Sequence, residues 1–178
     1  MSIITHEDIK KYVKDKINLP KERADKHRAQ VKSLRERLEA KIAEDPSFDL
    51  VKMLHAGSVA KGTALRTVND LDVAVYIKSG AAPVNDSELI QWFKDLLVQA
   101  NPNLSKDQFE PQTHCVTVHF SGSELSVDMV PVLYEGDEDD KGWLIRKGTG
   151  ERVLTSIPLH LKFIRDRKII YGDDYTQL

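Results

Sequence analysis

Residues 70–77, with the sequence DLDVAVYI, place two acidic side chains two positions apart at the start of an apolar run. The run is rich in β-branched residues, which predicts a buried β-strand. Because side chains at i and i+2 leave the same face of a strand, Asp70 and Asp72 are expected to lie side by side. Two carboxylates held this closely repel each other unless a cation lies between them. This segment therefore predicts a core strand that carries a cation-binding site.

The length of 178 residues suits one domain with a real hydrophobic core and is too short for two large domains. Apolar residues make up 40% and charged residues 30%, as in ordinary globular proteins, and the net charge of −2 does not decide for or against a nucleic-acid partner. The one cysteine, Cys115, excludes an intramolecular disulfide, and we interpret it as a buried apolar residue. Without a secretory signal or a membrane-spanning apolar run, a cytoplasmic location is expected.

Four segments show helical patterns. The segment 5–17 predicts a short helix that Thr5 caps, and residues from Lys21 to about Glu44 predict a longer one. Residues 87–99 predict an amphipathic helix, and another is expected from Ile157 to about Lys168. The apolar stripe of the long helix consists of Ala24, Val31, Leu34, Leu38 and Ile42.

Strand patterns alternate with these helices. Leu50 to His55 predicts one strand, and residues 112–121 and 124–133 predict a pair joined by a turn at Gly122-Ser123. The fold class expected from these elements is α+β, with a mixed β-sheet flanked by helices and a long N-terminal helix.

A small-residue turn precedes the acidic strand. Gly57 permits a tight turn and the close approach of a ligand to the backbone. Ser58 adds a hydroxyl beside N–H groups at a helix start, an arrangement that suits phosphate oxygens. Lys61 and Thr63 add a cation and a second hydroxyl nearby. The turn therefore predicts a phosphate-binding segment next to Asp70 and Asp72.

A third carboxylate, Asp128, lies in an otherwise apolar strand, where a charge is costly unless it is paired or bound to a metal. If that strand lies beside the first, Asp128 joins Asp70 and Asp72. Three such carboxylates are able to bridge two Mg²⁺ or Mn²⁺ ions about 3.5–4 Å apart, as in phosphoryl and nucleotidyl transfer. Asp128 would then lie on the side of the attacking hydroxyl and take its proton.

The Gly-Ser turn, the Asp-x-Asp strand and the later Asp resemble the DNA polymerase-beta-like nucleotidyltransferase superfamily. The longer form, GSVAKGTAL followed by DLDVAVYI, is similar to oligoadenylate synthetases, to cyclic GMP-AMP synthase and to the bacterial CD-NTases of CBASS anti-phage defence. The resemblance implies that Gly57 and Ser58 bind a donor triphosphate and that Lys61 lies toward the nucleotide or the acceptor. It also implies that two Mg²⁺ or Mn²⁺ ions are held by three ligands: Asp70, Asp72 and Asp128.

The implied activity is transfer of nucleotidyl groups from ATP- or GTP-type triphosphates to form cyclic or linear oligonucleotide second messengers. Residues 1–178 would then be the catalytic lobe of a polymerase-beta-like fold, with N-terminal helices in 1–46 and the core in 47–178. Enzymes of this kind continue into a helical lobe, which this sequence is expected to lack or to carry only in truncated form. We favour the interpretation that the chain is a fragment of a longer enzyme.

Two other functions stay open from the sequence. The chain could belong to an enzyme of the same superfamily that modifies a tRNA end, a protein or a small molecule such as an antibiotic. It could instead be a nucleotide-binding module without turnover. A nucleic-acid or protein activator also stays open, although the basic residues of helix 21–44 are better explained as a solvated face paired locally with Glu36 and Glu39. The acidic run 137–140 is expected to be a solvated loop.

Overall fold

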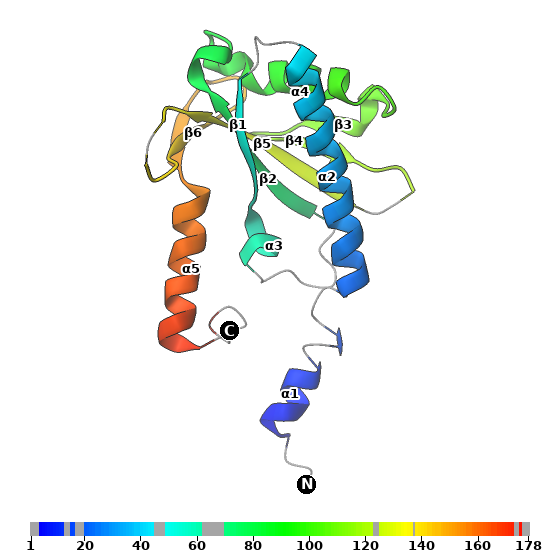
Figure 1. The fold of residues 1–178 in the computed structure, drawn as a ribbon, viewed down its shortest axis with the longest axis vertical. Helices are drawn as coiled ribbons and strands as arrows, with labels where there is room; N and C mark the ends of the chain where they lie inside the picture. The colour runs from blue at the N-terminus through cyan, green and yellow to red at the C-terminus, as the bar shows by residue number, and fades with distance from the viewer. Residues whose placement is uncertain are drawn as a thin grey trace.

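The structure is a computed structural model that describes residues 4–12, 15–16, 20–44, 49–61, 70–122, 125–136, 138–172 and 175. The helices are α1 (His6–Tyr12), α2 (Lys21–Glu44), α3 (Gly57–Lys61), α4 (Leu89–Ala100) and α5 (Ile157–Tyr171), with short 3-10 turns η2 (Ser79–Ala81), η3 (Asp86–Glu88) and η4 (Lys106–Gln108). The strands are β1 (Leu50–His55), β2 (Asp70–Lys78), β3 (Phe109–Pro111), β4 (Val116–His119), β5 (Ser126–Tyr134), β6 (Gly142–Ile145) and β7 (Arg152–Thr155). The expected α+β class is confirmed (Figure 1).

The strands form one mixed sheet in the order β1-β2-β5-β4-β3, and β6 and β7 extend it from β5. The central neighbours β2 and β5 run parallel, whereas the other pairs are antiparallel. The strand pair expected at 112–121 and 124–133 is present as the antiparallel pair β4 and β5, but β4 begins only at Val116. Ser123 of the expected turn lies outside the described residues. The strands β3, β6 and β7 were not predicted, because three or four residues are too few to show a period of two.

One face of the sheet packs against α2 and α4, as Figure 1 shows. The stripe expected on α2 is buried at Val31, Leu34 and Leu38, while Ala24 and Ile42 are half-buried. These side chains join one apolar cluster with the odd-numbered residues of β2 and the buried face of α4: Leu71, Val73, Val75, Ile77, Ile90, Phe93 and Leu97. This packing leaves the even-numbered residues of β2 to the opposite face of the sheet.

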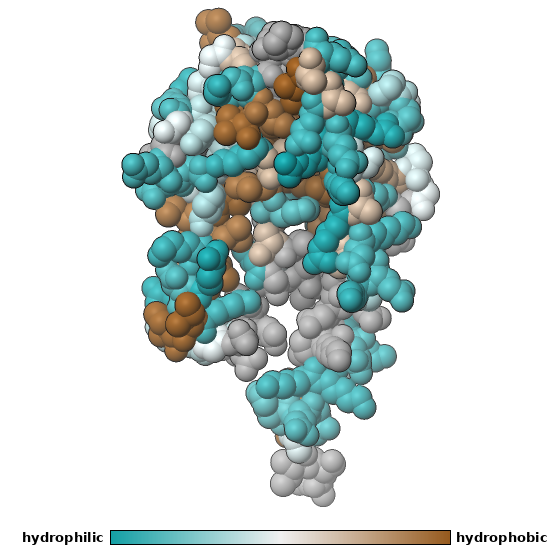
Figure 2. All heavy atoms as spheres, in the orientation of Figure 1, coloured by the Kyte–Doolittle hydropathy of each residue, from teal (hydrophilic) through white to brown (hydrophobic). Residues whose placement is uncertain are grey.

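The opposite face carries a smaller cluster around Ala74, Tyr76 and Val132. Tyr76 is fully buried, and its hydroxyl accepts a hydrogen bond of 3.2 Å from the backbone N–H of Ile157. Ile157 is the first residue of α5, so this bond fixes the start of that helix on the sheet. The rest of α5 buries none of its residues, and Figure 2 shows an apolar patch where the helix ends; Ile169, Ile170 and Tyr171 are exposed there.

Lys52 of β1 connects this cluster to the acidic loop. Its ammonium group lies 5.2 Å from the ring centroids of both Tyr76 and Tyr134 and forms an ion pair with Asp140. The loop was expected to be solvated, but the Asp140 side chain is only 26% exposed. The expectation of a solvated loop was wrong at Asp140. The ammonium group of Lys52 lies near two aromatic rings, and Asp140 is its partly buried counter-ion.

We expect Lys52→Met to lower the free energy of unfolding by about 1–3 kcal/mol, because it leaves Asp140 half-buried without its cation. Urea unfolding followed by circular dichroism measures the change. Lys32→Met is the matched control, since that side chain is 74% exposed and its ion-pair partner among the described residues is Glu36 on the same helix. Equal effects of the two substitutions would contradict the assignment of Lys52 as a structural cation.

Within the described ranges, no helix combines the length and the apolar character needed to cross a membrane.

Candidate active site

The predicted acidic residues lie on the parallel pair β2 and β5. In the register of this pair Asp72 is opposite Asp128, and Asp70 is opposite Ser126. Asp70 and Asp72 are two positions apart and therefore share the face of the sheet that does not pack against α2. Asp72 and Asp128 are half-buried, and Asp70 is exposed. The structure thus brings the three carboxylates to adjacent positions on one face.

Gly57, the first residue of α3, lies against the carboxylate of Asp72. The backbone N–H of Ala56 donates to the Asp72 carbonyl oxygen at 2.8 Å, which ties the turn to β2. Gly57 has a φ of +61°, and a Cβ atom added to it would lie 1.7 Å from Asp72 Oδ2. Both the backbone conformation and the available space therefore require glycine here.

The other two turn residues follow in the same short helix. Ser58 is half-buried at the second position of α3, and Lys61 is its last residue. The positive charge of Lys61 is close enough to Asp72 to offset a small part of the rise in the pKa of that carboxyl group, which burial and the other two carboxylates cause. Thr63, also singled out in the sequence, lies outside the described residues.

Two hydroxyl groups that sequence reasoning missed bind the outer carboxylates. Ser126 Oγ donates a hydrogen bond to Asp70 Oδ1, and Thr117 Oγ1 donates to Asp128 Oδ1 at 2.7 Å. Ser126 precedes Asp128 by two positions, so strand phase could have placed it on the acidic face. The partner of Thr117 could not be found in this way, because it depends on the register between β4 and β5.

The negative charges of the site favour the binding of a cation. Burial raises the pKa of Asp72, and the charges of Asp128 and Asp70 raise it further, while Lys61 only partly offsets this. A hard divalent cation among these oxygens would remove the repulsion, and carboxylates are the ligands that Mg²⁺ and Mn²⁺ prefer. As the described side chains lie, no three acidic, imidazole or thiol groups surround a single point closely enough to hold an ion. The chemistry of the donor set, three carboxylates on one face, fits a divalent metal.

Cys115 precedes β4 and lies beside this site, not in the apolar core that the sequence predicted. Burial and the nearby charge of Asp128 raise the pKa of its thiol to about 12. The thiol is therefore protonated at neutral pH, the form that is a poor nucleophile.

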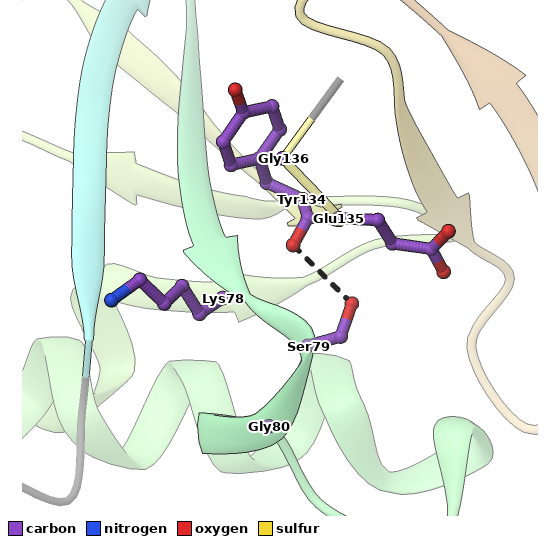
Figure 3. A pocket seen from close by; sticks show the side chains of 6 residues that line it. All are labelled: Lys78, Ser79, Gly80, Tyr134, Glu135 and Gly136. Carbon is purple, nitrogen blue, oxygen red and sulfur yellow. Dashed lines mark hydrogen bonds between the residues drawn. The ribbon is translucent and has the colours of Figure 1, made fainter.

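A cationic groove of about 240 Å³ adjoins the site between α3 and α5. Its lining residues are Ala60, Lys61, Leu161, Ile164, Arg165 and Lys168. A larger cavity of about 400 Å³ lies at the far ends of β2 and β5, where Figure 3 shows Lys78, Ser79 and Tyr134 around it. It contains no predicted site residue, so the smaller groove is the one relevant to the carboxylates.

We expect Asp72→Asn to raise the melting temperature of the metal-free protein at about pH 7. The pKa of Asp72 is higher in the folded than in the unfolded chain, so its ionisation opposes folding. This penalty is present above the folded-state pKa and is absent below the unfolded-state pKa of about 3.9. The advantage of the variant should therefore shrink as the pH falls toward about 4.

Thermal unfolding in EDTA over this pH range measures the effect. Asp95→Asn, at an exposed position of α4, is the matched control and should leave the melting temperature unchanged. A lower melting temperature of Asp72→Asn than of the wild type at neutral pH would contradict the electrostatic description of the site.

The sheet, the long helix α2 and the acidic face together define a nucleotidyltransferase fold of the polymerase-beta-like class. Residues 1–147 match the family described as Second Messenger Oligonucleotide or Dinucleotide Synthetase domain, and the chain belongs to this family. Its members are nucleotidyltransferases that generally use divalent metal ions.

The chain is 50% identical over 175 residues to the cyclic AMP-AMP-AMP synthase of Escherichia coli strain MS 115-1, covering 98% of this chain and 54% of that protein. It superimposes with a TM-score of 0.83 on the solved E. coli MS115-1 CdnC in complex with HORMA-deltaN, at 47% identity, covering 98% of this chain and 54% of that one. The structure of the same CdnC with ATP gives a TM-score of 0.81 at 48% identity, covering 97% and 54%. The chain therefore spans about half the length of the curated relatives it matches.

Proposed function

We propose that this chain is the catalytic lobe of an enzyme that transfers nucleotidyl groups from ATP- or GTP-type triphosphates and makes cyclic or linear oligonucleotide messengers in anti-phage defence. The observation that carries the proposal is the register of β2 and β5, with Asp72 opposite Asp128 and Asp70 on the same face. The identity of 50% with a cyclic AMP-AMP-AMP synthase supports ATP as a donor and a cyclic product.

In this proposal Asp70, Asp72 and Asp128 hold two Mg²⁺ or Mn²⁺ ions. When bound, such ions neutralise charge on the donor phosphates and increase the acidity of the attacking hydroxyl. Asp128 lies on the side of the attacking hydroxyl in this proposal and accepts its proton. The ribose oxygen forms a bond to the α-phosphorus of the donor, the bond to pyrophosphate breaks, and pyrophosphate leaves.

The donor end of the site is supplied by α3 and α5. Gly57 keeps the backbone close to Asp72 without a side chain, so the triphosphate is able to reach the carboxylate edge. Ser58 offers a hydroxyl to the phosphates. The cations Lys61, Arg165 and Lys168 line the adjoining groove, and their charges suit the negative polyphosphate tail.

The remaining parts of the complete protein are also proposals. The proposal includes a helical lobe after the catalytic lobe; the chain covers 54% of a relative's length, so the relative contains a further part. Within the catalytic lobe, the proposed N-terminal helices occupy 1–46 and the proposed core 47–178. The solved complex of CdnC with HORMA-deltaN supports a protein partner, whereas a nucleic-acid activator has less support because the α2 cations pair locally, for example Arg35 with Glu39 at 2.7 Å. A cytoplasmic location is part of the same proposal.

Incubation of the complete protein with labelled ATP and GTP and Mg²⁺ tests the function. The proposal expects pyrophosphate release and a small labelled product that resists phosphatase and nuclease treatment, as ring closure requires. A label on tRNA, protein or a small molecule would instead identify an enzyme of the same superfamily that modifies that acceptor. Tight binding of Mg²⁺–ATP in calorimetry without pyrophosphate release would instead assign a nucleotide-binding module.

A further inference from the structure

Two buried hydroxyl groups lie beside the outer carboxylates of the acidic face. We propose that Thr117 and Ser126 are positioning residues that turn Asp128 and Asp70 toward a shared divalent cation. The inference rests on the proposed function, since it assumes that these carboxylates bind metal. Neither hydroxyl is itself assigned as a ligand.

The register of the strands places each hydroxyl directly beside the carboxylate it binds. Thr117 of β4 is opposite Asp128 of β5, which is opposite Asp72 of β2. Two residues earlier on the same two strands, Ser126 of β5 is opposite Asp70 of β2. Thr117 and Ser126 are 7% and 8% exposed, so both hydroxyl donors are buried, while Asp128 is half-buried and Asp70 is exposed.

A hydroxyl donor at Oδ1 determines where Oδ2 lies. The last torsion of an aspartate side chain is broad, so an isolated carboxylate samples many orientations. A donor on the next strand removes that freedom, and Thr117 is itself stiff because it is β-branched. The hydroxyl holds Oδ1 of Asp128, and likewise of Asp70, and leaves Oδ2 available to a cation, which reduces the torsional freedom lost on binding.

The residue types at these two positions also fit the charge of the site. β2 presents Asp-x-Asp, and β5 presents Ser-x-Asp in parallel register against it. A fourth acid at position 126 would add a negative charge directly opposite Asp70 and close to Asp72. A hydroxyl at this position donates to Asp70 and so stabilises its negative charge.

The competing explanation is that these bonds only satisfy buried polar groups and keep β4 on β5. The two explanations differ in what they predict for cation binding. A purely structural bond lowers the stability of the metal-free chain and leaves the additional stability from Mn²⁺ unchanged. A positioning bond lowers the affinity for Mn²⁺ and therefore the additional stability that the ion confers.

The test compares Thr117→Val, which removes the hydroxyl at nearly constant shape, with Thr117→Ser, which keeps it. Free Mn²⁺ is measured by electron paramagnetic resonance in titrations of the 178-residue chain, and melting temperatures are recorded with and without Mn²⁺. We expect Thr117→Val to bind Mn²⁺ about 10–100-fold more weakly and Thr117→Ser to stay close to the wild type. Ser126→Ala should weaken binding in the same way and serves as the second variant if Thr117→Val does not fold.

Wild-type affinity in a folded Thr117→Val or Ser126→Ala would overturn the inference, as would an unchanged rise in melting temperature on addition of Mn²⁺. Absence of Mn²⁺ binding by the wild-type chain would overturn it too, because there would be no ligand set to orient. The proposed function fails separately. If the expected Mn²⁺ pattern is found but the complete protein releases no pyrophosphate from any triphosphate, the positioning role stands and the transferase does not.

Discussion

Asp72→Asn is expected to reduce nucleotidyl transfer by the complete protein about a thousandfold or more, which corresponds to about 4 kcal/mol of lost transition-state stabilisation. Asp72 is the central member of the acidic face, opposite Asp128 and two positions from Asp70. An amide of the same shape removes the charge that a divalent cation requires. Pyrophosphate release with ATP and Mg²⁺ measures the rate.

This result is separable from unfolding, because the same substitution is expected to stabilise the metal-free chain. If Asp72→Asn gains stability while losing activity, the loss of activity is due to the missing carboxylate charge and not to unfolding. Asp95→Asn again serves as the control and should keep the wild-type rate. An Asp72→Asn variant that retains more than about a tenth of that rate would contradict the proposed role of the carboxylate.

Gly57→Ala carries the second largest expected effect. The added Cβ would lie 1.7 Å from Asp72 Oδ2, so either the turn or the carboxylate must move. A displacement of about 1 Å at a reacting site costs about a hundredfold in rate, and we expect at least this loss in pyrophosphate release. The φ of +61° adds backbone strain, so the free energy of unfolding should also fall by about 1–3 kcal/mol.

Gly80→Ala is the control for this change. A Cβ at Gly80 would meet no atom within 4 Å, so the same substitution is expected to alter neither rate nor stability. Retention of full activity by Gly57→Ala would show that the close approach to Asp72 is not needed for catalysis.

Long elements of the fold were predictable because their patterns repeat. Helix α2 has the bounds Lys21–Glu44 that its apolar spacing and flanking residues indicate. Strand β2, Asp70–Lys78, contains the predicted segment 70–77 and ends one residue beyond it, since β-branched residues define its interior but not its limits. By contrast, β6 pairs Trp143 with Leu154 of β7 in a hairpin too short to be seen as an alternation.

The candidate site was predictable along each strand but not between strands. Strand phase places Asp70 and Asp72 on one face, and burial cost singles out Asp128. Whether β5 lies next to β2 depends on the sheet order, which local patterns do not contain. The contact of Thr117 with Asp128 depends on the register between β4 and β5. The sequence therefore predicts the carboxylates but not the hydroxyl group that binds Asp128.

The proposed function depends on Asp70, Asp72 and Asp128 forming one metal site. Crystals of the chain grown with Mn²⁺ and a non-hydrolysable ATP analogue test this. Anomalous diffraction locates the ion without reference to the protein. We expect an anomalous peak about 2.0–2.3 Å from a carboxylate oxygen of Asp72 and from an oxygen of at least one of the other two. An Mn²⁺ ion that binds the analogue away from these carboxylates, without a contact to Asp72, would contradict the assignment of the metal site.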